Sequence, residues 1–288
     1  EANTIPAQGT MDYLHVRVPT KFAEDVWVQG AEVMPTDRTV VHHVIVYLDD
    51  HSGEPSQGLG GAHLCGYAPG DMPSVFPEGT AKKIPAGSDL IFELHYTPNG
   101  RVRTDRSKLG LILAKGPVTR QAYTVPIAQF RFVIPAGEPA VPVTASMTVP
   151  KEMRLLGYMP HMHLRGKDFQ YTIAKPGGEP EVALSVPAYD FGWQSYYLLK
   201  EPLTLPAGTK IDCLAHFDNS PQNPHNPDPT RDVRWGNQTH EEMMIGYIDV
   251  DFPADEPFDL FGKRSRNRTG SRAADQGEGR AEATTAGR

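Results

Sequence analysis

The segment Ile84-Pro-Ala-Gly-Ser-Asp-Leu-Ile-Phe-Glu-Leu-His-Tyr96 occurs a second time in this chain, as Leu205-Pro-Ala-Gly-Thr-Lys-Ile-Asp-Cys-Leu-Ala-His-Phe217, and the two copies align without a gap. Each copy has a Pro-Ala-Gly turn followed by a run with strand character that reaches a histidine. The distance to an upstream histidine is repeated as well, because His42 and His163 each lie 53 residues before the histidine of a copy (95 − 42 and 216 − 163). The repeat predicts two domains of similar topology, each with histidines brought together from distant strands.

The rest of the chain is also typical of a β protein. Its 27 Pro and 27 Gly allow the frequent turns that many short strands require, and no convincing amphipathic helix precedes residue 262. We therefore predict an all-β fold of two antiparallel, jelly-roll-like β-sandwich domains in tandem, over residues 1–117 and 118–262. Residues 263–288 contain almost nothing that could be buried, and we expect them to be a disordered tail.

The strands of both predicted domains can be placed from alternation and β-branched content. The expected strands are 11–18, 25–33, 39–48, 89–96 and 108–114 in the first domain, and 120–125, 141–149, 153–160, 168–174, 181–186, 194–200, 209–216 and 243–250 in the second.

The charge and the apolar segments of the chain give no support to nucleic-acid binding or to a membrane span. The chain has 288 residues and a net charge of −7, which gives no reason to expect a nucleic-acid partner. No apolar run approaches the roughly 18 residues that would predict a membrane span, and no signal peptide is recognisable. Because the chain begins abruptly at Glu1, we expect a mature protein or a fragment, with further domains missing from either end.

The pattern Tyr158-Met-Pro-His161-Met-His163 predicts a metal site in the second domain. Residues i and i+2 of a strand point to the same face, so the two imidazoles can be directed at one point. Met243 is placed to complete the set, and Met244 should face the other way. Two imidazoles and a thioether favour copper that cycles through Cu(I). The alternative is a pair of unconnected surface histidines and a methionine that fills the core.

The first domain offers a second set of candidate ligands, His42, His43 and His95. Adjacent residues of an ideal strand face opposite ways, so His42 and His43 can bind one metal only with a twist, a bulge or different ring nitrogens. The alternative is one core histidine and one surface histidine. A blue-copper site around Cys213 lacks a compact ligand loop, and no catalytic Cys-His or Ser-His-Asp signature is recognisable.

Residues 10–250 resemble the copper type II, ascorbate-dependent monooxygenases, the family of peptidylglycine α-hydroxylating monooxygenase and dopamine β-monooxygenase. The resemblance rests on motifs in the family's order: His42-His43, Glu93-Leu-His95-Tyr96, His161-x-His163 with Gly166-Lys167, and Glu241-Glu-Met243. It implies two copper ions per chain, in two β-sandwich domains that face each other across a solvent-filled cleft. It also implies that the His42, His43 and His95 site takes electrons from ascorbate. By the same resemblance, His161, His163 and Met243 bind O2 and a small-molecule substrate and insert one oxygen atom into a C–H bond.

Departures from the family pattern bear on the substrate. Met159 stands where the peptide-amidating members carry an arginine that binds a peptide carboxylate, and Ile245 stands where they carry an asparagine. We therefore do not expect a peptide with a C-terminal glycine as substrate. Tyr247 matches the family's substrate-pocket tyrosine. Cys213 matches one half of a family disulfide whose partner is replaced by Met244, so we expect both cysteines to be free, as in bacterial members.

The repeat suggests one further residue, His216, which occupies the position of His95 in the second copy. We hypothesise that His216 lies near the second copper as an extra ligand or as a hydrogen-bond partner of a ligand; the alternative is a satisfied histidine at a strand end. The sequence as a whole predicts a copper-dependent monooxygenase that is secreted or periplasmic, as the resemblance implies. The alternative function is a non-catalytic copper-binding or carrier module of a larger secreted protein.

Overall fold

The computed structural model describes residues 2–51, 62–70 and 73–256 of the chain, and every regular element among them is a β-strand. This confirms the all-β prediction. The described residues include no helix with the length and apolarity to cross a membrane. The predicted tail, residues 263–288, lies outside the described residues.

One four-stranded antiparallel sheet belongs to the N-terminal half and carries the first histidine cluster. Its strands, in spatial order, are β2 (Leu14–Pro19), β8 (Asp89–Tyr96), β4 (Val41–Asp49) and β5 (Ala62–Tyr67). β4 is β-branched and mostly buried, as expected for a strand covered on both faces. Its apolar side chains form one core cluster with residues from β3, β5, β7 and β8.

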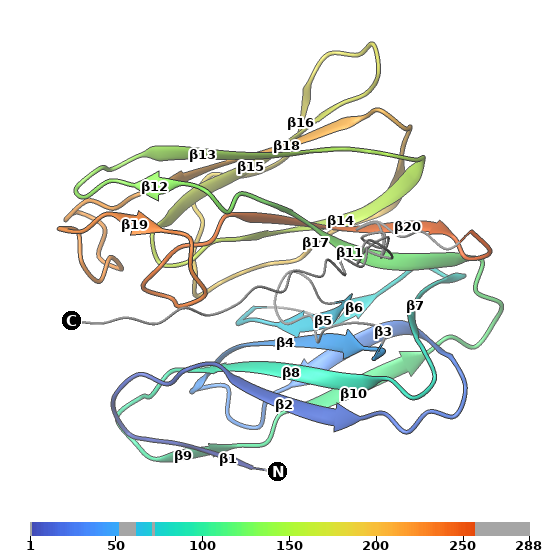
Figure 1. Ribbon diagram of the computed structural model, residues 1–288, viewed down its shortest axis with the longest axis horizontal. Helices are drawn as coiled ribbons and strands as arrows, with labels where there is room; N and C mark the ends of the chain where they lie inside the picture. Colours follow the sequence, from blue (N-terminus) through green and yellow to red (C-terminus); the bar gives the residue numbers. More distant parts are fainter. Residues whose placement is uncertain (1, 52–61, 71–72, 257–288) are drawn as a thin grey trace, which may run out of the picture. The chain divides into compact units, whose positions relative to one another are not determined.

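The largest sheet has eight strands and contains strands from both halves of the chain (Figure 1). Its members, in spatial order, are β10 (Lys108–Leu113), β3 (Val26–Met34), β7 (Thr80–Ile84), β11 (Arg120–Ala128), β20 (Ile245–Pro253), β14 (Met153–His161) and β17 (Tyr197–Leu205), with β6 (Ser74–Val75) paired to β3. The two halves join where β7 and β11 run parallel, with Thr80 opposite Arg120 and Ala81 opposite Gln121.

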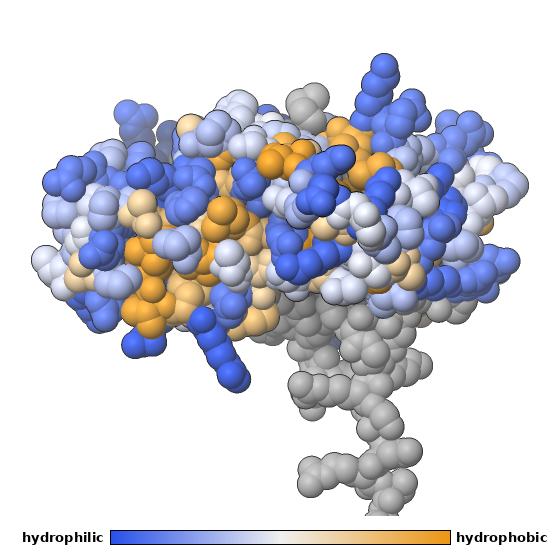
Figure 2. All heavy atoms as spheres, turned by 90° about the horizontal axis from the view of Figure 1, so that it is seen from above, coloured by the Kyte–Doolittle hydropathy of each residue, from blue (hydrophilic) through white to orange (hydrophobic). Residues whose placement is uncertain are grey.

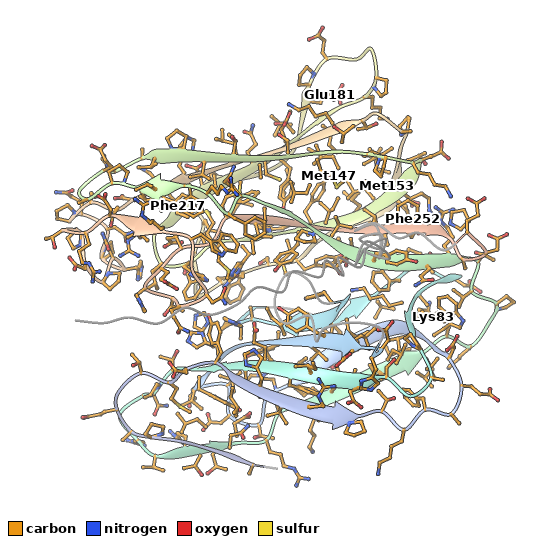
Figure 3. All side chains as sticks on the ribbon, viewed as in Figure 1. Lys83, Met147, Met153, Glu181, Phe217 and Phe252 are labelled. Atoms are coloured by element: carbon orange, nitrogen blue, oxygen red, sulfur yellow. The ribbon has the colours of Figure 1, made fainter. Side chains whose placement is uncertain are left out.

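A second four-stranded sheet covers the C-terminal half of the large sheet. Its strands, in spatial order, are β13 (Val141–Thr148), β18 (Lys210–Phe217), β15 (Gly166–Ala174) and β16 (Glu181–Val186). Two short pairs complete the fold, β1 (Asn3–Ile5) with β9 (Arg103–Asp105) and β12 (Val133–Ile134) with β19 (Val233–Arg234). Met153, Phe217 and Phe252 are fully buried in the core of this half (Figure 3).

β20 lies inside the large sheet, between β11 and β14, and is buried on both faces. A Cβ on Gly246 would lie 2.5 Å from the Cys213 sulfur, so this face of β20 packs against β18. Asp251 points to the opposite face of β20, toward Thr80 of β7, and is fully buried. Its carboxylate oxygens lie 2.6 Å from a guanidinium nitrogen of Arg120 and 2.6 Å from one of Arg154. The buried charge is compensated by two guanidinium groups, as a buried carboxylate requires.

The predicted division into domains at residues 117 and 118 falls between β10 and β11. Each half has its own pair of sheet layers, yet the large sheet continues through the boundary, and residue contacts group Glu1–Pro257 into one compact unit. The division into two domains therefore stays a prediction.

The predicted repeat forms the same turn twice. Gly87 and Gly208 have φ of 72° and 83°, a left-handed conformation that glycine adopts without strain, and β8 and β18 follow them. The neighbours of these two strands differ, however. β8 pairs directly with β4, which carries the upstream His42-His43, whereas β18 and β14 lie in different sheets. The equal histidine spacing thus does not produce equal placement.

Most expected strands are present with shifts of a few residues, and 89–96 and 181–186 match β8 and β16 at both ends. β5, β6, β7 and the short paired strands were not expected, because turn-forming residues surround them. The expected strand at 194–200 begins only at Tyr197. The face in Figure 2 mixes polar and apolar side chains, as is usual for a protein surface, and half-exposed apolar residues such as Val182 and Leu198 occur on strands.

Candidate metal centres and the cavity between them

The first histidine cluster is built by a β-bulge. β4 pairs with β8 so that Val41 lies opposite Tyr96 and His43 lies opposite His95, which leaves His42 as the extra residue of the bulge. A bulge re-aims a side chain that would otherwise point to the opposite face. The structure therefore provides the distortion that a neighbouring pair of histidine ligands requires.

The three imidazoles of this cluster converge closely. Nitrogen atoms of His42, His43 and His95, one from each ring, all lie within 4.8 Å of one another. The Nδ1 atoms of His42 and His43 are 3.1 Å apart, and the ring centroids of His43 and His95 are 4.9 Å apart. Rings at this spacing can share one ion of the kind that imidazole favours, such as copper or zinc.

Burial keeps these histidines neutral. It lowers the pKa of His42 to about 4 and that of His95 to about 3, and the pKa of His43 lies well below its usual value. The charge of neighbouring histidines lowers each pKa further. Neutral imidazole is the form that binds metals. The Nδ1 atom of His95 is buried without a hydrogen-bond partner, which is costly unless a ligand fills the place. The residues present therefore fit a metal ion.

The second pair, His161 and His163, sits where β14 ends. His161 is the last residue of the strand, and His163 already lies in the turn toward β15. The two rings are nevertheless close, with centroids 5.3 Å apart and planes at 85°. The sequence argument from strand alternation therefore predicted the convergence of the rings, but the turn rather than the strand positions His163.

Hydrogen bonds fix which nitrogen each of these rings offers. His161 Nδ1 donates to Gln194 Oε1 at 2.7 Å, and His163 Nδ1 donates to the Glu241 carbonyl at 3.1 Å. The Gln194 amide is itself oriented, because its Nε2 donates to the Phe191 carbonyl at 3.1 Å. With both Nδ1 atoms bonded to acceptors, each ring carries its free lone pair on Nε2. This arrangement of a second nitrogen bonded to a carbonyl is typical of histidines that bind metals.

Met243 lines the same cavity as His161 and His163, just before β20 begins. Met244 is fully buried, and its side chain does not line that cavity, which agrees with the expectation that the two methionines face opposite ways. The predicted set of two imidazoles and one thioether therefore lines one cavity. This set suits a soft ion such as Cu(I).

A buried polar scaffold holds the turn of His163 in place. The carboxyl group of Glu242 is fully buried and accepts hydrogen bonds from the backbone N–H of His163 at 2.9 Å and of Arg165 at 2.7 Å. Burial raises the pKa of Glu242 to about 8, although these N–H groups act to lower it. The Arg165 side chain is 2% exposed and donates to Asn219 Oδ1 and to the His240 carbonyl. The scaffold connects residues that are far apart in sequence.

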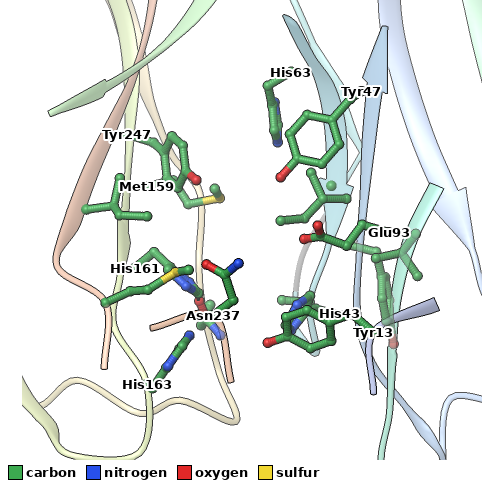
Figure 4. A pocket seen from close by; sticks show the side chains of 18 of the residues that line it. Tyr13, His43, Tyr47, His63, Glu93, Met159, His161, His163, Asn237 and Tyr247 are labelled. Carbon is green, nitrogen blue, oxygen red and sulfur yellow. The ribbon is translucent and has the colours of Figure 1, made fainter. Parts of the chain in front are cut away.

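One cavity of about 380 Å³ is lined by His43 of the first cluster and by His161, His163 and Met243 of the second. In Figure 4, Tyr247, His161 and His163 lie on one side and face Glu93 and His43 on the other. Aromatic side chains supply much of the rest of the wall, namely Tyr13, Tyr47, Tyr67, Phe130 and Trp235. A cavity of this size and apolar character can hold a small organic molecule.

Of the two remaining predicted site residues, Tyr247 and His216, only Tyr247 lies at the cavity. Tyr247 lines the cavity, with its ring centroid 6.4 Å from that of His161. The structure does not bring His216 into this group: its Nδ1 is bonded to Asp168 Oδ1 at 2.7 Å, and its side chain does not line the cavity. The reason is the sheet topology, since β18 pairs with β15, where Asp168 lies opposite His216, and not with β14, which carries His161. Cys65 and Cys213 are buried free thiols.

Several residues at the site were not predicted from the sequence. His63 on β5 lines the cavity, and both of its ring nitrogens are buried without a hydrogen-bond partner. Gln194 and Phe191 come from the segment between β16 and β17, and no local motif marks them. Glu93 was noted only as part of a motif. The one available signal was for Glu242, an acidic residue directly before the predicted Met243 ligand.

Comparisons with known proteins add little to this description. No family model and no curated protein matches the sequence. Similar solved structures include the infectious bursal disease virus Gx strain, at 7% identity and a TM-score of 0.27 over 88% of this chain and 70% of that one. A VP2 subviral particle of the same virus has 11% identity and a TM-score of 0.23, over 80% of this chain and 58% of that one. With values this low, we draw no conclusion from the likeness.

Proposed function

We propose that the protein is a copper-dependent monooxygenase that hydroxylates a C–H bond of a small molecule with O2 and a one-electron reductant such as ascorbate. The proposal rests on one observation above all. A set of three imidazoles reaches a cavity through His43, and the same cavity is lined by all three members of a second set, His161, His163 and Met243. The resemblance of the motifs to the copper type II, ascorbate-dependent monooxygenases points the same way.

The two sets suit different tasks. His42, His43 and His95 would hold one copper, and imidazole nitrogen binds both Cu(II) and Cu(I). His161, His163 and Met243 would hold the other, where the thioether favours Cu(I). When bound, copper supplies the one-electron and dioxygen chemistry. The protein supplies orientation: Gln194 and the Glu241 carbonyl hold the rings of His161 and His163 in place.

The cavity wall favours a substrate with a positive charge on an apolar body. Among the described residues that line it, none is Lys or Arg, whereas Asp12 and Glu93 are acidic. Burial, followed by the negative charge of Glu93, raises the pKa of Tyr247, and Glu93 also contributes to the raised pKa of Tyr13. A carboxylate beside aromatic rings binds an organic cation by charge and by cation–π contact. A peptide carboxylate would meet no Lys or Arg side chain among the described residues of this wall.

The experiment is measurement of O2 consumption by the purified protein with ascorbate and small amines, with and without copper. We expect consumption that depends on both copper and substrate and is abolished by His161→Ala. His216→Ala is the matched control, because this histidine is bonded to Asp168 outside the cavity, and it should retain activity. Copper bound at two ions per chain without consumption of O2 would instead favour the carrier module.

A further inference from the structure

The segment 187–196 connects β16 in the four-stranded sheet with β17 in the eight-stranded sheet. It contacts both histidine clusters on the way. Phe191 stacks on His42, with centroids 4.3 Å apart and planes at 24°. The same ring meets His163 edge to face, at 5.7 Å and 70°. The centroids of His42 and His163 are therefore at most about 10 Å apart, the sum of the two distances, with one phenyl ring between them.

The backbone of this segment also acts on the second cluster. The Phe191 carbonyl accepts the hydrogen bond from Gln194 Nε2 that orients the amide, and Gln194 Oε1 in turn accepts from His161 Nδ1. Tyr189 donates its hydroxyl hydrogen to the Met162 carbonyl at 2.7 Å, between the two histidines. One short segment thus contacts His161, Met162 and His163 in addition to His42.

His42 is the ring that most needs an external support. It is the bulged residue of β4, and it is only partly buried, whereas His43 and His95 are buried. The face of its imidazole is covered by Phe191, which comes from the other half of the chain. Stacking of this kind restricts the rotation of a ring that a metal ion would otherwise have to immobilise on binding.

We propose that Phe191 is a positioning residue shared by the two metal centres, so that one aromatic ring sets the metal affinity of both. The inference rests on the proposed function only for the identity of the metal. Residues that orient metal-binding histidines typically change metal affinity by roughly 10- to 100-fold when they are replaced. We expect a loss in this range at both sites when the phenyl ring is removed.

The test uses two proteins with one site each. His161→Ala with Met243→Ala leaves the His42, His43 and His95 site and keeps His163 beside the phenyl ring. His43→Ala with His95→Ala leaves the second site and keeps His42 in its stack. The Cu(I) affinity of each is measured by competition with a chromophoric chelator, with Phe191 intact and as Phe191→Leu, which retains bulk but not the ring.

The expected result is an affinity loss of about 10-fold or more in both proteins with Phe191→Leu. Phe191→Tyr keeps the ring and should restore both affinities, together with the Cu(II) EPR hyperfine splitting of the first site. Phe132→Leu is the matched control, because Phe132 is also a partly buried ring, stacked on Phe217 at 5.7 Å and not lining the cavity. It should leave both affinities unchanged.

Unchanged affinities with Phe191→Leu, or a loss at only one site, overturn the shared role. If neither one-site protein binds Cu(I) with Phe191 intact, both the proposed function and this inference fail. If both bind Cu(I) and Phe191→Leu leaves their affinities unchanged, this inference alone fails. Thermal unfolding of the metal-free proteins checks that each variant folds. Phe191→Met, unbranched and of similar size, replaces Phe191→Leu if the latter does not fold.

Discussion

Replacement of Glu242 by alanine should strongly destabilise the metal-free protein. The side chain is fully buried, and its two oxygens accept from the backbone N–H groups of His163 and Arg165 at 2.9 and 2.7 Å. Alanine leaves both buried donors without an acceptor, at a cost of about 1–3 kcal/mol each. We therefore expect a loss of about 4 kcal/mol in the free energy of unfolding.

Glutamine at the same position separates hydrogen bonding from packing. Glu242→Gln retains the volume and one acceptor oxygen, but its amide N–H2 would face one of the two backbone donors. The expected loss is therefore roughly half as large, about 2 kcal/mol. Because Glu242 holds the turn of His163, both variants should also weaken Cu(I) binding at the His161, His163 and Met243 site by about 10-fold or more.

Urea denaturation of the metal-free protein measures the first effect. With a slope of about 3 kcal/mol per molar urea, Glu242→Ala should lower the midpoint by more than about 1 M. The exposed Glu152→Ala should stay within about 0.5 kcal/mol of the wild type. A loss of less than about 1 kcal/mol for Glu242→Ala would refute the reasoning, because it would mean that the two N–H groups find other acceptors at little cost.

Three further outcomes are expected. Glu93→Gln should raise KM for a cationic substrate by about 10-fold and leave that for a neutral analogue unchanged; equal effects on both would argue against charge recognition. Burial acts to raise the pKa of Asp105, but hydrogen bonds, first from Ser107, outweigh it, and the pKa is lowered. The contribution of the ionised Asp105 to the free energy of unfolding is therefore complete above the unfolded-state pKa near 4 and is lost as pH falls. The difference in urea midpoint between wild type and Asp105→Asn should accordingly shrink below about pH 4, and a difference that grows on acidification would contradict this. Gly246→Ala should lower the free energy of unfolding, measured by thermal unfolding, by about 1–3 kcal/mol, because the new Cβ would lie 2.5 Å from the Cys213 sulfur. A variant as stable as the wild type would show that the two sheets can separate at this point.

The sequence was most informative where local chemistry decides the structure. The two Pro-Ala-Gly turns and the strands after them could be placed because the turn needs a glycine at positive φ, which Gly87 and Gly208 supply. The need for a distortion at His42-His43 also followed from strand alternation alone, and the bulge between Val41 and His43 provides it. These inferences use only neighbouring residues.

Inference from the sequence was weakest where distant segments meet. The position of His216 could not be derived from its spacing. His42 lies on β4, which pairs with β8, whereas His163 lies in the turn between β14 and β15 and not on a strand that pairs with β18. The joining of the halves depends on two residue pairs between β7 and β11, too few to leave a pattern. Phe191 and Gln194 reach the histidines from a connecting segment, and an aromatic or amide residue in a loop carries no signal of its partner.

The polar atoms left unpaired at the site argue that these histidines are ligands rather than core residues. A histidine that only fills a core usually has its ring nitrogens bonded, because a buried polar atom without a partner costs about 1–3 kcal/mol. His161 and His163 have Nδ1 bonded to protein acceptors, yet both border an open cavity, and His95 Nδ1 has no partner at all. Five histidines from two halves of the chain are held neutral by burial, and three of them, His43, His161 and His163, line one cavity. Such a set would be a persistent cost to a purely structural protein. Binding of a metal ion would offset that cost, because an ion that binds only the folded state stabilises it.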